Sequence, residues 1–176
     1  MQRVDHRNTI LVEQYLGGLA AFPFIWFLGS LGSFLRTHGE PRLAAVAFGG
    51  GIVTAGLALA FAAIQATLAF DVAKQGDPAV VRALFDLNSL LPFPFVLAVL
   101  VGATSIAALR SKALPRWYGL VGALVALVDL VGGTTFARTG FWSPTGGFGF
   151  IFVFLVFLGW LLVTSGLLVI KIGAAE

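Results

Sequence analysis

The sequence predicts an all-α integral membrane protein, a polytopic bundle of five transmembrane helices. The first observation is composition: 59% of the 176 residues are hydrophobic, only 11% are charged, and the mean hydropathy is +0.97. Soluble domains average about 25% charged residues, and a chain this apolar cannot cover a surface that faces water. The second observation is that five apolar runs each reach the ~20 residues that a helix needs to cross a bilayer.

The predicted spans are taken in chain order. Residues 1–14 mix polar and apolar side chains without a continuous apolar core, so they are expected to form an external N-terminal segment and not a cleavable signal peptide. Residues 15–171 are expected to form a single transmembrane bundle. Its spans cover about residues 15–35, 43–70, 84–109, 117–136 and 148–170.

Helical structure is also expected for the start of the last span. Its sequence, "FGFIFVFLVF", alternates aromatic residues as a strand would. A helix is nevertheless predicted, because the run is long and an open strand cannot satisfy its backbone hydrogen bonds in lipid.

Prolines are expected to bend two of the spans. Pro23 lies inside the first span, and Pro92 and Pro94 lie inside the third. Each proline removes a backbone donor and clashes with the preceding turn. Asp77 and Pro78 are a typical N-cap and first helical residue, so the third helix is expected to begin before the membrane. A helix over residues 78–109 would be about 48 Å long, against a ~30 Å hydrocarbon core, which favours an external amphipathic turn-in followed by a kinked span.

Small residues repeat at four-residue spacing in the second span, at Ala47, Gly51 and Ala55. Such spacing lets helix backbones approach closely. Packing within the chain is the favoured interpretation, since this pattern is common in membrane spans, and a dedicated dimer face is the alternative.

The basic residues indicate an orientation. The connection "RSKALPR", residues 110–116, carries a dense basic cluster without acids, whereas the basic residues of the opposite side are mixed with acidic ones. Positively charged loops stay in the cytoplasm. The N-terminus is therefore predicted outside and the C-terminus inside, in a bacterial inner membrane. No basic patch interleaved with aromatic residues suggests nucleic-acid binding.

One acidic residue lies within a span, Asp129 in "LVALVDLVGG". A charge near the bilayer centre costs about 2.5–3.5 kcal/mol and usually faces the bundle interior or a wet cavity. With this topology, most intramembrane polar side chains share the outer half of the bundle around an externally open crevice. These candidate site residues are Asp129, Gln65, Asp86, Asn88 and Arg82.

Two interpretations of Asp129 stay open. In the structural one, a protonated acid hydrogen-bonds to Gln65 or Thr134 and locks two helices together. In the functional one, the carboxyl group carries a proton, coordinates a cation or receives a polar substrate.

Several kinds of chemistry find no residues in the sequence. The chain has no cysteine, which excludes thiolate catalysis and cysteine-ligated metal clusters. The two histidines, His6 and His38, lie outside the predicted spans, and no lysine lies inside one. No catalytic motif occurs, and His38 beside Glu40 is a weak metal suggestion because zinc needs three or four ligands. No catalytic residue, cofactor or metal site is predicted, and an enzyme is the least favoured class.

Several stretches in a common order resemble a known family. They are "AFPFIWFLGSLGSFLR", "PRLAAVAFGGGIV", "DPAVVRALFDLNSL", "ALRSKALPRWYGLVGALVALV" and "GFWSPTGGFGFIFVFLVFLGWLLVTS". The chain resembles the uncharacterised multi-pass membrane proteins of actinobacteria, from about Asp5 onward. The resemblance implies one further N-terminal span in the family, which this chain lacks, and brings no reaction with it.

The sequence leads to two functional hypotheses. The first is a non-enzymatic accessory or scaffold subunit that packs laterally against other membrane subunits or against itself. It is suggested by the short loops, the missing catalytic residues and the small-residue and aromatic faces. The second is a small proton- or ion-coupled transporter centred on Asp129.

Overall fold

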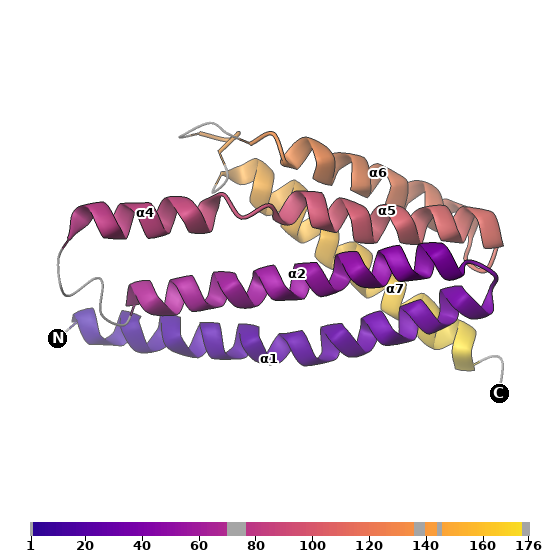
Figure 1. Cartoon of the computed structure of the whole chain (residues 1–176), viewed down its shortest axis with the longest axis horizontal. Coiled ribbons are helices and arrows are strands. Elements are labelled where there is room, and N and C mark those ends of the chain that lie inside the picture. Colours follow the sequence, from indigo (N-terminus) through magenta and orange to yellow (C-terminus); the bar gives the residue numbers. More distant parts are fainter. Residues whose placement is uncertain (1, 70–76, 136–139, 144–145, 174–176) are drawn as a thin grey trace. The chain divides into compact units, whose positions relative to one another are not determined.

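A computed structural model describes residues 2–69, 77–135, 140–143 and 146–173, with residues 2–8 and 172–173 described by backbone alone. All elements in these ranges are helical, and no strand occurs among them (Figure 1). The prediction of an all-α fold is confirmed. In chain order the helices are α1 (Gln2–Thr37), α2 (Pro41–Thr67), α4 (Pro78–Ser89), α5 (Phe93–Ser111), α6 (Arg116–Gly132), the π-helix η2 (Gly149–Leu155) and α7 (Val156–Gly173).

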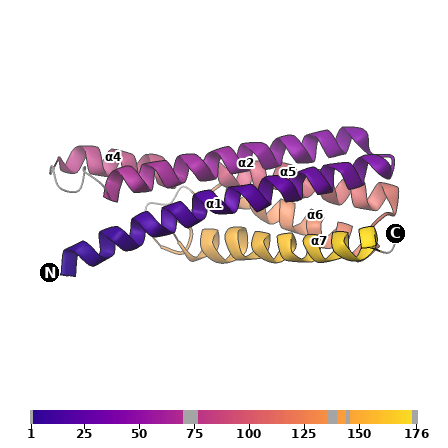
Figure 2. The same cartoon turned by 90° about the horizontal axis from the view of Figure 1, so that it is seen from below.

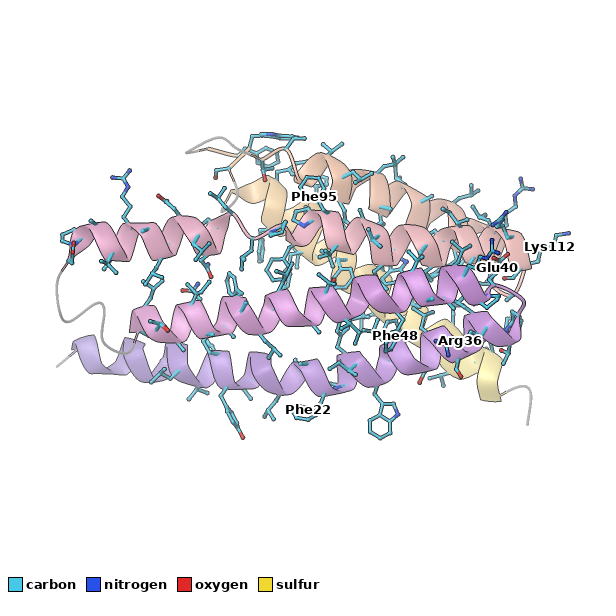
Figure 3. All side chains as sticks on the ribbon, in the orientation of Figure 1. Phe22, Arg36, Glu40, Phe48, Phe95 and Lys112 are labelled. Atoms are coloured by element: carbon cyan, nitrogen blue, oxygen red, sulfur yellow. The ribbon has the colours of Figure 1, made fainter. Side chains whose placement is uncertain are left out.

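The helices have the length and surface of membrane spans. Among the described residues, four stretches are long and apolar enough to cross a membrane: Thr9–Thr37, Pro41–Thr67, Pro78–Ser111 and Gly149–Lys171. The remaining predicted span contains α6, whose 17 residues extend about 26 Å. Large apolar side chains project outward, such as Phe22, 72% exposed and drawn pointing away from α1 in Figure 3, and Trp26, 82% exposed. Such a surface belongs in lipid, and the chain is a multi-pass integral membrane protein.

Two compact units divide the chain. Unit 1 consists of Met1–Ile25 and Ala55–Leu91, and unit 2 consists of Trp26–Thr54 and Pro92–Glu176. The boundaries thus fall at three points: just after Pro23 inside the continuous helix α1, between Thr54 and Ala55 inside α2, and between Leu91 and Pro92. That residues 15–171 form a single bundle stays a prediction.

In unit 1, helix α4 begins as the sequence indicates. The Asp77 side chain accepts a hydrogen bond from the Ala79 backbone N–H at 2.9 Å, and Pro78 occupies the first turn. The helix ends at Ser89, and the next helix, α5, starts only at Phe93. The predicted kink at Pro92 and Pro94 is therefore a break between two helices, because Pro92 has no N–H to continue the ladder and disfavours helical backbone at the residue before it.

In unit 2, a tight turn joins α1 to α2. Gly39 has a φ of +86°, and the Glu40 N–H donates to the Leu35 carbonyl at 3.0 Å. This six-residue closure around a left-handed glycine is a Schellman cap, which satisfies carbonyls at the helix end. Helix α1, which ends at this cap, has a buried stripe at Leu28, Leu31 and Leu35, each at most 1% exposed.

The small residues of α2 within unit 2 serve packing. A Cβ placed on Gly51 would lie 2.5 Å from Leu28 Cδ1, so a larger residue here would require the Leu28 side chain to move. One turn earlier, Ala47 is 1% exposed. These contacts favour the interpretation of this pattern as packing within the chain.

The α5–α6 hairpin supplies most of the interior of unit 2. The two helices lie side by side (Figure 1), joined by a short connection that starts at Lys112, whose φ is +54°. Figure 3 shows Lys112 at the far end of this hairpin and Phe95 near the start of α5. Four residues named or implied in the sequence predictions, Phe70, Lys74, Phe136 and Arg138, lie outside the described residues.

Candidate functional site

Helix α6 turns one continuous face to the interior of unit 2. Its buried residues Tyr118, Gly122, Val125, Asp129 and Gly132 recur every three or four positions. This period places them on a single stripe. Helix α5 covers α6 on one side, and η2 and α7 cover it on another, as the paths of these helices in Figure 2 show.

The contacts with α5 fix which residues lie at the same level as Asp129. A Cβ on Gly102 of α5 would lie 3.5 Å from Ala126 Cβ, and a Cβ on Gly132 would lie 3.5 Å from Pro94 Cβ. Helices α5 and α6 are therefore antiparallel, and these two contacts fix which of their residues lie opposite each other. Between these two contacts, the level of Asp129 on α6 corresponds to that of Ala98 on α5, a buried residue.

The contacts with η2 and α7 run antiparallel as well. Near one end the Tyr118 hydroxyl and Thr164 Oγ1 are 2.7 Å apart, and one turn along α6 a Cβ on Gly122 would lie 3.2 Å from Trp160 Nε1. At the other end, a Cβ on Gly132 would lie 2.6 Å from Val153 Cγ2. Asp129 thus lies between the levels of Trp160 and Val153.

The carboxyl group of Asp129 is fully buried, and no described residue forms a hydrogen bond with it. Its side chain is 0% exposed, and within the described part of the chain neither Oδ1 nor Oδ2 accepts or donates a hydrogen bond. Thr134, a predicted partner, donates its hydroxyl to the Val131 carbonyl at 2.7 Å instead. The predicted hydrogen bond from Asp129 to Thr134 is therefore absent from the structure.

Apolar residues occupy the level of Asp129. Ala98 of α5 is buried at this level, and the residues about one turn away are buried as well: Val125 and Gly132 on α6, and Val153 of η2, which lies against Gly132. Val153 belongs to a π-helical segment of seven residues, Gly149–Leu155. Such segments are rare and occur frequently at functional sites. Among the described residues, the carboxyl group has no hydrogen-bond partner to offset its burial.

A series of buried polar side chains occupies the stripe between Asp129 and the start of α6. Thr164 donates to the Trp160 carbonyl at 2.7 Å, so the Tyr118 hydroxyl is the donor in its own bond to Thr164. Ser105 of α5 donates to the Val101 carbonyl at 2.7 Å and lies against Gly122. Trp160 is only 5% exposed, yet its Nε1 has no hydrogen-bond partner among the described residues.

The other four predicted site residues all belong to unit 1. Arg82 and Asp86 are exposed on α4, and Gln65 on α2 is half-buried. Asn88 is 7% exposed, and its Oδ1 has no partner within the described ranges. Since Asp129 belongs to unit 2, a crevice shared by all five residues stays a prediction.

Sequence reasoning missed the polar residues that lie nearest Asp129 along the interior of unit 2. Tyr118 is in register with Asp129 on α6, and Trp160 and Thr164 are one helical turn apart on α7. The 3.6-residue period could have placed each pair on one face. Their meeting across two helices depends on the antiparallel register, which no single-helix pattern contains.

Comparison with protein-family models, with curated proteins and with solved structures finds no match to this chain. The resemblance to actinobacterial multi-pass membrane proteins therefore stays a prediction, and the functional argument depends on the site itself.

Proposed function

We propose that this membrane protein is a small proton- or ion-coupled transporter with Asp129 at its centre. One observation carries the proposal: a fully buried carboxyl group inside a helical interface, with neither oxygen hydrogen-bonded to a described residue. Ionisable residues inside membrane spans are rare because they are costly, and they mark ion pathways and proton relays.

The free-energy cost of burying the Asp129 carboxyl group disfavours a purely structural role for it. A structural acid offsets its burial with a hydrogen bond or an ion pair. Asp129 has neither among the described residues, and the hydroxyl of Thr134 is used elsewhere. Asp129 lies in the last turn of α6. A buried carboxyl group without a stabilising contact is better explained by a ligand or proton that it binds in part of a cycle.

Flux measurements test this function. Purified protein is reconstituted into liposomes that contain K⁺ and a pH-sensitive dye, and valinomycin then creates a negative interior. Wild-type vesicles should acidify faster than protein-free vesicles, and Asp129→Asn should remove the difference while the variant still elutes as a folded species. Acidification and uptake of radioactive sodium that are both equal in wild-type and Asp129→Asn vesicles contradict the proposal.

A second candidate, the accessory subunit, is supported by a different feature. On α7 the residues Gly159, Leu162, Gly166 and Val169 recur at helical spacing, and Leu155 at the end of η2 continues the pattern. The two glycines have nothing within 4 Å of an added Cβ, whereas Leu162 and Val169 are 72% and 73% exposed. Open glycines beside projecting side chains form the type of face on which another membrane helix packs.

The accessory-subunit function has its own experiment. Membranes are extracted with a mild detergent and separated on native gels. If α7 binds a partner helix, the double variant Gly159→Leu/Gly166→Leu should shift the protein from a larger complex to a lone chain. Gly56→Leu is the matched control, because Gly56 is equally open but lies on α2. Wild-type protein that already migrates as a lone chain counts against this function.

A further inference from the structure

The polar groups of the α6 interface are distributed unevenly about Asp129. Toward the start of α6 lie Ser105, Tyr118, Trp160 and Thr164, none more than 5% exposed. We call these four residues the polar seam. At the level just beyond Asp129 in the other direction, apolar groups pack on the glycines: Val153 and Phe148 against Gly132, and Phe95 against Gly133. The buried Thr135 hydroxyl at this level is already used, because it donates to the Gly132 carbonyl at 2.8 Å.

The polar seam contains a poorly satisfied donor. Trp160 Nε1 is buried and makes no hydrogen bond of good geometry with a described residue, and the polar side chain with which it interacts is Tyr118. A Cβ on the neighbouring Gly122 would lie 3.2 Å from Nε1. Ser105 Oγ approaches the same glycine from α5. Because Gly122 has no side chain, the indole nitrogen and the serine hydroxyl flank bare backbone. Buried polar groups are normally hydrogen-bonded, so a buried N–H without a well-placed acceptor can bind a transient partner such as water.

The seam also has a direction. Tyr118 is its last member toward the start of α6, close to the connection that contains Lys112 and Arg116. From Tyr118 to Asp129 is eleven positions, about 16 Å along the helix. Trp160 and Ser105 lie at the level of Gly122, four positions from Tyr118 and seven from Asp129. Transient water is therefore needed over the last ~10 Å to the carboxyl group.

The surroundings of Asp129 favour a proton over a metal cation. Hard cations such as Ca²⁺ and Mg²⁺ need about six oxygen ligands, and the described residues contain no group of three His, Cys, Asp or Glu side chains. Charged groups on the packed helices are far from the site and exposed: Arg110 ends α5, Arg116 starts α6 and Lys171 ends α7, while η2 has none. Tyr118 is the nearest titratable side chain on the stripe.

Resting on the proposed function, we propose that the ion handled at Asp129 is a proton, and that it reaches the carboxyl group along the polar seam from the Tyr118 end. One carboxylate oxygen forms one O–H bond and the negative charge is neutralised, so no further ligand is needed. The apolar layer at Phe95, Phe148 and Val153 closes the opposite direction.

The same vesicles test the proton route through substitutions in the seam. Trp160→Phe and Tyr118→Phe keep the ring but remove the N–H or O–H group. Each should slow Asp129-dependent acidification by about tenfold or more. The Tyr118 hydroxyl can both accept and donate a proton, whereas the Trp160 N–H can only donate a hydrogen bond and acts by holding a water molecule that carries the proton. Trp117→Phe and Tyr15→Phe are the matched controls, because these side chains are 52% and 69% exposed. The controls should acidify at the wild-type rate.

The outcomes separate the inference from the function on which it rests. If acidification depends on Asp129 but both seam variants match their controls, the route is wrong and the proposed function stands. If uptake of radioactive sodium depends on Asp129 and acidification does not, the ion is not a proton. If neither flux depends on Asp129, the proposed function itself fails. Gel filtration of each variant shows that it is folded, and Tyr118→Phe alone decides the route if Trp160→Phe does not assemble.

Discussion

The hydroxyl groups of Tyr118 and Thr164 lie 2.7 Å apart in the interior of unit 2 and join α6 to α7. The residues are 46 positions apart in the sequence, and both side chains are at most 1% exposed. Thr164 already donates to the Trp160 carbonyl, so the bond has a defined direction, from Tyr118 to Thr164. The two hydroxyl groups therefore differ in what their loss would leave behind.

Removing these hydroxyls should have unequal effects on stability. Tyr118→Phe deletes the donor and leaves Thr164 bonded to Trp160, which should cost about 0.5–1.5 kcal/mol. Thr164→Val leaves the buried Tyr118 hydroxyl unpaired and should cost about 1–3 kcal/mol. The free energy of unfolding is measured by titrating detergent-solubilised protein with SDS. Thr67→Val, an exposed threonine with the same type of backbone bond, should change it by less than ~0.5 kcal/mol. Equal losses at Tyr118 and Thr164 would contradict the assigned direction.

The turn at Gly39 should not tolerate a side chain. With a φ of +86°, an L-residue at this position is strained, and Gly39→Ala should lower the free energy of unfolding by about 1–2 kcal/mol. Gly39→Asn should cost less, because asparagine tolerates the left-handed region. Gly29 lies inside α1, the helix that this turn ends, and an added Cβ there would meet open space. Gly29→Ala should therefore raise the free energy of unfolding by up to ~1 kcal/mol. A thermal melt followed by tryptophan fluorescence checks the order of the three variants.

Features governed by local chemistry were predictable from the sequence. Asp77 and Pro78 start α4 as expected, because an N-cap and a first-turn proline act within one helical turn. The interruption at Pro92 was expected as a kink and is a break, since two prolines in three residues remove more than one backbone donor. Helix α1 continues back to Gln2, whereas the first span was expected to begin at about Tyr15. The additional helix was not expected because the residues before Tyr15 include many polar ones and form no continuous apolar run.

The candidate site was predictable only in part. Asp129 stands out in any hydropathy analysis, because a carboxyl group in an apolar run is rare. Its lack of partners was not predictable, since it depends on which residues of α5 and η2 lie at its level. The π-helical start of the last span also escaped prediction, because the aromatic pattern of residues 148–157 does not distinguish a π-helix from an α-helix.

Loss of the N-cap should loosen α4 locally. Asp77→Ala removes the acceptor of the Ala79 N–H and should cost about 1 kcal/mol, seen as faster hydrogen exchange of the backbone amides in the first turn of α4. Asp77→Ser retains an acceptor oxygen and should exchange close to the wild-type rate. The amides of α6 serve as the internal reference and should not change. Uniformly faster exchange in both helices would show that the effect is global and not due to the cap.

The closest packing of the polar seam should be sensitive to a single methyl group. A Cβ at Gly122 would press on Ser105 Oγ, whose hydroxyl is fully buried and bonded to the Val101 carbonyl, so Gly122→Ala should cost about 1–3 kcal/mol. Gly159→Ala is the matched control, since that glycine lies in open space on α7 and should gain up to ~1 kcal/mol in helix propensity.

A double-mutant cycle then identifies the cause of that loss. Ser105→Ala removes the oxygen that the new methyl group would meet, so its combination with Gly122→Ala should cost less than the sum of the two single changes. The free energies of unfolding come from the same SDS titration. Strict additivity would mean that the methyl group is rejected by something other than Ser105. Trp160 Nε1 would lie 3.2 Å from the new methyl group and is the next side chain to test. In that case, Trp160→Phe combined with Gly122→Ala should cost less than the sum of those two single changes.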